Sequence, residues 1–386
     1  MRTAVLALWS ALAVTPAAPA EPMFQGLGHF ADGTYSAAHG VSPDGKVVLG
    51  IGKHSGSVYR EAFRWTAADG IQGLGYISGP STSENTAFAA SADGSLIVGR
   101  DGGQGFTWTE VAGMAGLGYV GGWRPGAGSS ALDVSADGSV IVGYSTSPSP
   151  LPVQAVRWRS DGLRSLGWLP GGGDHPDKGS KAMAVSADGR IIAGESYGDF
   201  YGKVAVRWVD EVIESLGDLS GGDYPWAQAT AVSDDGSVVV GNGSRGDAYT
   251  CLEAFRWTPA LGMQGLGTGG FSASYATDVS GDGTIVVGYG FRQYVGTAAC
   301  LWDAAGQFRL LGNVLTQDYG LNLGGWWLDQ ALGISSDGRT IVGVGHNPLG
   351  QQEAWMAIIP EPGTLAILAL GGLAILRRKR ASDGEG

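Results

Sequence analysis

Asp133 and Asp278 occupy equivalent positions in a repeated pattern of this chain, where the other repeats have glycine or alanine. Two carboxyl groups that approach one cavity from different sides are the tools of glycoside hydrolysis, because one acts as acid and the other as nucleophile or base. The alternative is structural, with each carboxylate solvated or hydrogen-bonded to a nearby turn. We favour the structural interpretation, assign no catalytic residues, and keep the pair as the runner-up site of a carbohydrate-active enzyme.

No other constellation in the sequence indicates catalysis. The chain has no nucleophile motif, and its glycine runs do not link a strand to a helix as phosphate-binding loops do. The repeated Asp-Gly pairs offer too few carboxylates each for a calcium site, so we interpret them as turns. The histidines show no metal-ligand spacing and are interpreted as surface or loop positions, and we predict no metal and no cofactor. They are His29, His39, His54, His175 and His346.

Aromatic and polar residues gather in the segments that connect one repeat to the next. Aromatic ring faces can stack on sugar rings, and connecting loops on a rigid scaffold often carry function. The alternative for any one of them is ordinary loop packing. The candidate ligand-binding residues are Trp123, Arg124, His175, Tyr224, Trp226, Trp326 and Trp327.

These candidates are placed by a pattern that recurs seven times. An Asp-Gly pair returns every 44 to 55 residues, from Asp44-Gly45 to Asp337-Gly338. Each pair follows a serine, and another glycine comes five residues after its own. Each unit predicts four strands, with an Asp-Gly hairpin between the first two and a tryptophan at the end of the third. Four strands per unit favour an all-β, seven-bladed β-propeller in which these tryptophans pack between blades.

The last repeat lacks its fourth strand, because the fold ends near Ile359. Residues 23–28, at the other end of the folded region, have the composition of that missing strand. We therefore predict one domain over residues 21–359, closed into a ring when the N-terminal strand completes the last blade. Such closure removes the free sheet edges that promote aggregation.

The composition excludes some classes of function. The 68 glycines disfavour a helical protein, and the net charge of −12 without a basic stripe in the body argues against nucleic-acid binding. The two cysteines leave two interpretations open. Cys300 is either a small buried hydrophobic residue or the partner of Cys251 in a disulfide.

The two ends of the chain predict export. Residues 1–20 have a positive start, an apolar run and an Ala-x-Ala site, which is the pattern of a signal peptide cleaved after Ala20. Residues 360–386 form a tail in which Pro360, Glu361 and Pro362 precede an uncharged segment, residues 364–376. That segment would span roughly 20 Å as a helix, which is short for a lasting anchor. The basic cluster behind it, which should stay cytoplasmic, is Arg377, Arg378, Lys379 and Arg380.

This order of motifs resembles the PEP-CTERM sorting signal. The resemblance implies recognition by an exosortase-type enzyme, transient insertion in the inner membrane, removal of the tail, and delivery to the cell surface or an exopolysaccharide matrix. The repeats also resemble the HAF family of extracellular repeats through motifs such as Glu253-Ala254-Phe255-Arg256-Trp257. That second resemblance implies an extracellular location and no defined enzymatic activity.

We therefore expect a non-enzymatic protein of the cell surface or matrix. Its partner would be exopolysaccharide or another envelope component, bound through the aromatic loops. Two alternatives remain open: a carbohydrate-active enzyme that uses Asp133 and Asp278, and a purely structural coat protein.

Overall fold

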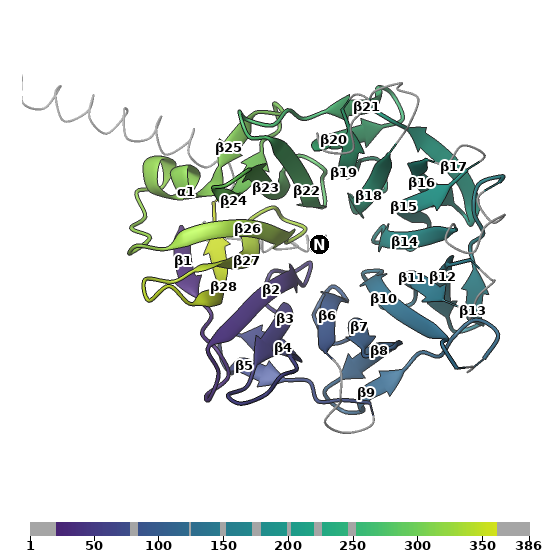
Figure 1. Cartoon of the computed structure of the whole chain (residues 1–386), viewed down its shortest axis with the longest axis horizontal. Coiled ribbons are helices and arrows are strands. Elements are labelled where there is room, and N and C mark those ends of the chain that lie inside the picture. The colour runs from purple at the N-terminus through teal and green to yellow at the C-terminus, as the bar shows by residue number, and fades with distance from the viewer. Residues whose placement is uncertain are drawn as a thin grey trace, which may run out of the picture. The chain divides into compact units, whose positions relative to one another are not determined.

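A computed structural model of the chain describes residues 21–77, 84–122, 125–146, 152–171, 179–198, 202–219, 226–245 and 252–360. Within them, residues Pro22–Ile359 form a compact unit built of seven four-stranded antiparallel sheets. The sheets stand around a central axis as the blades of a propeller (Figure 1). The predicted seven-bladed β-propeller is thus confirmed.

Each blade runs from an inner strand at the axis to an outer strand at the rim. The inner strands are β2 (Tyr35–Val41), β6 (Asn85–Ala90), β10 (Gly128–Val134), β14 (Ser180–Val185), β18 (Ala227–Val232), β22 (Ala273–Val279) and β26 (Trp327–Ile334). The second strands are β3 (Val48–Lys53), β7 (Ile97–Asp101), β11 (Ile141–Thr146), β15 (Ile191–Tyr197), β19 (Val239–Ser244), β23 (Val286–Arg292) and β27 (Thr340–His346). The third strands are β4 (Glu61–Thr66), β8 (Gln104–Thr109), β12 (Gln154–Arg159), β16 (Lys203–Val209), β20 (Leu252–Thr258), β24 (Gly296–Trp302) and β28 (Gln352–Ile358). The outer strands are β5 (Gly70–Gly73), β9 (Gly113–Gly116), β13 (Gly162–Ser165), β17 (Val212–Gly217), β21 (Gly262–Gly265), β25 (Phe308–Leu310) and β1 (Met23–Gly26). We number the blades 1 to 7 in the order of their inner strands.

The N-terminal strand completes blade 7, as predicted. Strand β1 pairs antiparallel with β28, from Met23 opposite Ile358 to Gly26 opposite Trp355. The ladder continues with a bond from the Leu27 amide to the Ala354 carbonyl, at 2.8 Å. Strand β1 thus covers the outer edge of β28, and the two ends of the propeller share one sheet.

A second closure links all seven blades at the axis. In each repeat but the first, the amide of the residue between the serine and the aspartate donates a hydrogen bond to the carbonyl of the corresponding residue in the next blade. The N···O distances around the ring are 2.8 to 3.1 Å. Pro43 has no amide hydrogen, so Asp44 donates in its place. The ring runs from Asp44 to Ala92, then to Ala136, Ala187, Asp234, Gly281, Ser336 and back to Pro43.

The repeated Ser-x-Asp-Gly turn is held by its own side chains. In blade 5 the Ser233 hydroxyl donates to Asp235 Oδ1 at 2.8 Å and accepts from the Val238 amide at 3.0 Å. Gly236 has a φ of 72°, and a Cβ there would lie 2.4 Å from a carbon of Ile191 in blade 4. The aspartate thus stabilises a turn that packs on the preceding blade. Among the described residues, no group of three or more acidic, His or Cys side chains could hold a metal ion.

The tryptophan of each third strand packs between blades. Trp158, Trp208 and Trp302 donate from Nε1 to the carbonyl of the leucine that follows the outer strand of the preceding blade, at 2.8 to 3.0 Å. Blade 7 departs from the predicted pattern, because Trp355 lies opposite Gly343 and so takes the position that Phe255 has in blade 5, while Ala357 stands at the tryptophan position. The leucine after the outer strand of blade 6, Leu311, begins a helical turn, α1 (Leu311–Asn313), followed by a π-helical turn, Val314–Asp318. The Leu311 carbonyl accepts from an amide of that turn, and Trp355 Nε1 is buried without a hydrogen-bond partner in the described structure.

Some expectations concern residues outside this description. They include the signal peptide, the hydrophobic segment 364–376, the basic cluster 377–380 and Cys251. Cys300 is fully buried in β24, and burial raises the pKa of its thiol. Among the described residues, no helix is long and apolar enough to cross a membrane.

Candidate functional site: the loop face and the central channel

The propeller has two faces of different character. Because the strands of each blade alternate in direction, one face carries the connections between second and third strands and between blades. We call it the loop face; it includes residues 27–34, 54–60, 293–295, 311–326 and 347–351. The opposite face, the turn face, carries the Asp-Gly hairpins and the short connections to the outer strands.

Three of the predicted loop residues lie in the described part of the chain, and their surroundings differ. Trp327 is 55% exposed, and its Nε1 donates to the Thr297 carbonyl of blade 6 at 3.1 Å. Trp326 is mainly a packing residue, because its ring meets Phe24 edge-on at 5.4 Å. Trp226 is half-buried, and Lys203 Nζ lies 5.8 Å from its ring centre. The remaining candidates lie outside the described residues: Trp123, Arg124, His175 and Tyr224.

The structure adds exposed apolar side chains that the sequence interpretation missed. Tyr294 is 97% exposed at the tip of the β23–β24 hairpin, with a φ of 64°. On the loop face of blades 6, 7 and 1, further exposed side chains are Val58, Tyr59, Phe291, Val295 and Leu349. These side chains add apolar surface to the loop face of three blades. The aromatic residues in the loops between second and third strands could have indicated these side chains. The prediction took its candidates from the segments between blades instead.

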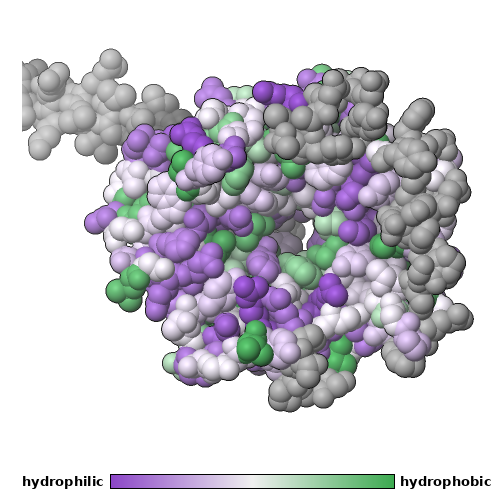
Figure 2. Space-filling view, in the orientation of Figure 1, coloured by the Kyte–Doolittle hydropathy of each residue, from purple (hydrophilic) through white to green (hydrophobic). Residues whose placement is uncertain are grey.

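The central channel holds the two candidate carboxylates. In the space-filling view the ring is hollowed at its centre, and hydrophobic side chains line part of the hollow (Figure 2). The cavity has a volume of about 550 Å³ and is lined by inner-strand residues of all seven blades. Its wall includes Phe88, Leu132, Met183, Leu332, Asp133 and Asp278.

Asp133 and Asp278 both line this cavity, and both connect neighbouring blades. Each follows a bulge in its inner strand. Asp133 accepts from the amides of Val134 and, in blade 4, Val185, both at 2.7 Å. Asp278 accepts from Val279 and, in blade 7, Ile334, both at 2.8 Å. Burial raises the pKa of each carboxyl to about 7, although the main-chain bonds oppose the shift. A carboxyl of this pKa can exchange a proton at neutral pH, but the main chain already occupies both oxygens of each group.

His39 also lies in the channel, which corrects its interpretation as a surface or loop residue. It belongs to β2, and its ring stacks on Phe88 with a centroid distance of 6.2 Å. Burial lowers the pKa of His39 to about 4, so the ring is neutral at pH 7. The sequence showed no signal for this placement, because His39 occupies the bulge position where other repeats have phenylalanine, leucine, methionine or threonine.

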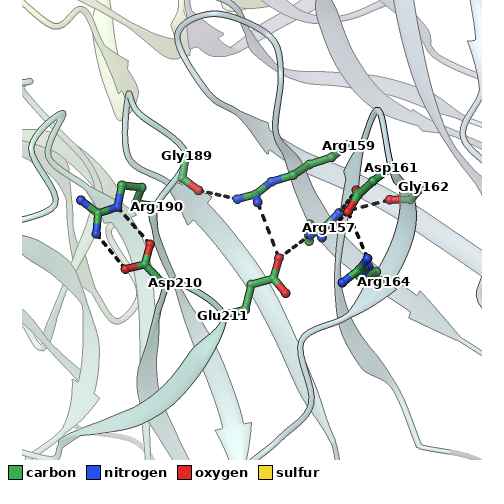
Figure 3. A network of polar contacts seen from close by, with 9 residues as sticks. All are labelled: Arg157, Arg159, Asp161, Gly162, Arg164, Gly189, Arg190, Asp210 and Glu211. Atoms are coloured by element: carbon green, nitrogen blue, oxygen red, sulfur yellow. Dashed lines mark hydrogen bonds and ion pairs between the residues drawn. The ribbon is translucent and has the colours of Figure 1, made fainter.

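A network of charges on the turn face joins blades 3 and 4 (Figure 3). Arg157 is 2% exposed, and its Nε donates to Glu211 of the next blade at 2.7 Å. Its other nitrogens bind Asp161. Asp210 and Glu211 have positive φ values, of 48° and 69°, which aim the Glu211 carboxylate at Arg157 and Arg159. The bonds connect the two blades, so we assign the network a structural role.

Comparisons with known proteins agree with the fold and the tail. Residues 359–380 match the PEP-CTERM protein-sorting motif. No protein of curated function matches the chain significantly. The β-propeller domain of the Trilobed protease from Pyrococcus furiosus is similar in structure, with a TM-score of 0.51 and 11% identity over 83% of this chain and 95% of that one. A structure of prolyl endopeptidases gives a TM-score of 0.51 and 10% identity over 85% of this chain.

The chain spans 51% of the length of that endopeptidase. TolB from Acinetobacter baumannii matches with 11% identity and a TM-score of 0.47, over 69% of this chain and 63% of TolB. Likeness at these identities shows the propeller fold alone. The resemblance of the repeats to the HAF family stays a prediction. The sorting motif implies export, a transient membrane anchor and recognition by an exosortase-type enzyme. The chain is therefore an exported seven-bladed propeller that carries a PEP-CTERM sorting motif.

Proposed function

We propose that this exported propeller is a non-enzymatic protein of the cell surface or extracellular matrix that binds exopolysaccharide through its loop face. The observation that carries the proposal is Trp327. Its indole ring is 55% exposed, yet a hydrogen bond to the Thr297 carbonyl fixes its orientation. A held, exposed aromatic plane is suited to stack on a sugar ring, because a tryptophan combines an apolar surface with a polar edge.

The path of the chain supports this choice of face. Strand β28 ends at Ile358, and the Ile359 amide donates to the Arg339 carbonyl in an Asp-Gly hairpin, at 2.9 Å. The connection to the sorting motif therefore leaves from the turn face. The last strand of the propeller thus ends on the face opposite the one proposed to bind the ligand.

The test is co-sedimentation of the full chain, in mild detergent, with the exopolysaccharide of the producing cells. Trp327→Ala should reduce binding, while Leu261→Ala, a 71% exposed residue of the turn face, should not. If Trp327→Ala and the intact chain bind alike, Trp327 does not anchor the glycan and the proposal loses the observation that carries it; if neither binds, the structural-coat alternative is favoured.

The second candidate function is polysaccharide cleavage by Asp133 and Asp278. One observation favours it: both carboxyls line the same cavity with pKa values raised to about 7. This alternative expects turnover of a polysaccharide that Asp133→Asn abolishes, measured as the release of reducing ends. Loss of turnover without loss of binding would replace our proposal with the enzymatic one.

A further inference from the structure

We infer that a pocket on the loop face of blade 1, bordered by one residue each from blades 7 and 2, binds an anionic sugar, a pyranose ring that carries one negative group. The inference rests on the proposed function and names the ligand class of part of that face. The pocket has a volume of about 540 Å³, within the range of small-molecule sites. Its main lining residues are Tyr35, Lys53, Tyr59, Arg60, Glu84 and Gln352.

Two tyrosines provide the aromatic surface of the pocket. Tyr59 is 38% exposed on the loop between β3 and β4. The Ser57 hydroxyl donates to the Tyr59 carbonyl at 2.8 Å and accepts from its amide at 3.1 Å, so the backbone that carries the ring is pinned. Tyr35 is half-buried, and burial raises the pKa of its phenol, so the hydroxyl stays a hydrogen-bond donor at neutral pH.

An ion pair fixes the polar side of the pocket. Arg60 Nη1 lies 2.7 Å from Glu84 Oε1, and the guanidinium lies over the Tyr35 ring, 4.7 Å from its centre. The pair neutralises both charges but leaves further guanidinium N–H groups for sugar hydroxyls. The side-chain amide of Gln352 supplies another donor and acceptor from blade 7.

Lys53 gives the pocket its charge. It stands directly opposite Tyr35 in the β2–β3 ladder, so both side chains lie on the same face of the sheet. Of the four lysines in the described ranges, Lys46, Lys181 and Lys203 form ion pairs with carboxylates, and Lys53 forms none. A free cation beside two aromatic rings, in a chain of net charge −12, selects a ligand with one negative group. The group can be a carboxylate or a sulfate, because both offer oxygen acceptors to an ammonium.

The test measures affinity of the full chain for polygalacturonate, dextran sulfate and neutral dextran of matched length. Lys53→Met should weaken, by roughly tenfold, the binding of whichever anionic polymer fits the pocket. It should leave the binding of dextran unchanged. Tyr59→Ala should weaken binding of all polymers, because it removes the stacking surface. The control is Lys46→Met, whose side chain is 79% exposed on the turn face. Comparison of the two anionic polymers tells a carboxylate site from a sulfate site.

The outcomes separate this inference from the proposal on which it rests. If dextran binds as well as both polyanions, or if Lys46→Met weakens binding as much as Lys53→Met, the anionic pocket is wrong. If Trp327→Ala reduces binding while Lys53→Met and Tyr59→Ala do not, the loop face binds glycan elsewhere and only the inference is overturned. If neither these polymers nor the exopolysaccharide of the producing cells binds, both are overturned.

Discussion

Two fully buried tryptophans of the propeller differ in whether the indole N–H has a hydrogen-bond partner. Trp208 and Trp355 are both fully buried in third strands, Trp208 near the end of β16 and Trp355 in the middle of β28. Trp208 Nε1 donates to the Leu166 carbonyl at 2.8 Å, whereas Trp355 Nε1 has no partner in the described structure. A phenylalanine at either position removes the same atoms, so the loss of packing should be similar.

The two substitutions should therefore differ in their effect on stability. Trp208→Phe leaves the buried Leu166 carbonyl without this donor, which costs about 1–3 kcal/mol beyond the packing loss. Trp355→Phe removes a buried donor that was already unsatisfied, so it incurs no such cost. We expect Trp208→Phe to lower the free energy of unfolding by about 2 kcal/mol more than Trp355→Phe does.

The assay is urea unfolding followed by circular dichroism, because tryptophan fluorescence would change with the substitutions themselves. Both variants should keep the denaturant slope of the intact chain, so that a change in midpoint reports stability. Equal costs, within about 0.5 kcal/mol, would refute the reasoning and would indicate that water or a shifted ring satisfies Trp355 Nε1.

Three further predictions concern closure, pH and the turns. Deletion of residues 21–30 removes β1 and exposes the edge of β28, so the variant should aggregate and melt at a lower temperature; a melt like that of the intact chain would contradict the closure. Burial opposes protonation of His54, but its hydrogen bonds to Asp32 and Glu61 raise its pKa. The contribution of His54 to the unfolding free energy should therefore be present below about pH 6.5 and be lost as pH rises through the raised pKa, so the difference in stability between the intact chain and His54→Gln should shrink with rising pH, whereas the contributions of Asp133, Asp278 and His39 are common to both. Gly236→Ala should cost at least about 1 kcal/mol in urea unfolding, since alanine is strained at a φ of 72°.

The propeller could be predicted because its repeats carry local chemistry. Asp-Gly supplies the positive φ of a hairpin, and a tryptophan marks each third strand, although in blade 7 it stands two residues earlier in the register than in the other blades. The closing strand followed from counting strands in the last repeat. The main-chain ring at the axis could not be foreseen, because it joins residues such as Ala92 and Ala136 whose proximity depends on how closely the blades approach.

The candidate site could be predicted less well. Asp133 and Asp278 do reach one cavity, but their bonds to Val185 and Ile334 of the next blades depend on the bulge geometry. The pocket at Lys53 joins residues from both ends of the chain, and no local pattern records that Lys53 lacks an ion-pair partner. The exposure of a loop side chain depends on the elements that fold against it. The sequence therefore did not distinguish Trp326, which packs on Phe24, from the exposed Trp327.

The central claim is that the loop face of an exported propeller binds a glycan of its own envelope. The most direct measurement is the dissociation constant of the full chain for exopolysaccharide from the producing cells, compared between the intact chain, Trp327→Ala and Leu261→Ala. We predict roughly tenfold weaker binding for Trp327→Ala, because it removes an aromatic anchor, and unchanged binding for Leu261→Ala. Equal dissociation constants for all three, or no measurable binding by the intact chain, would contradict the account.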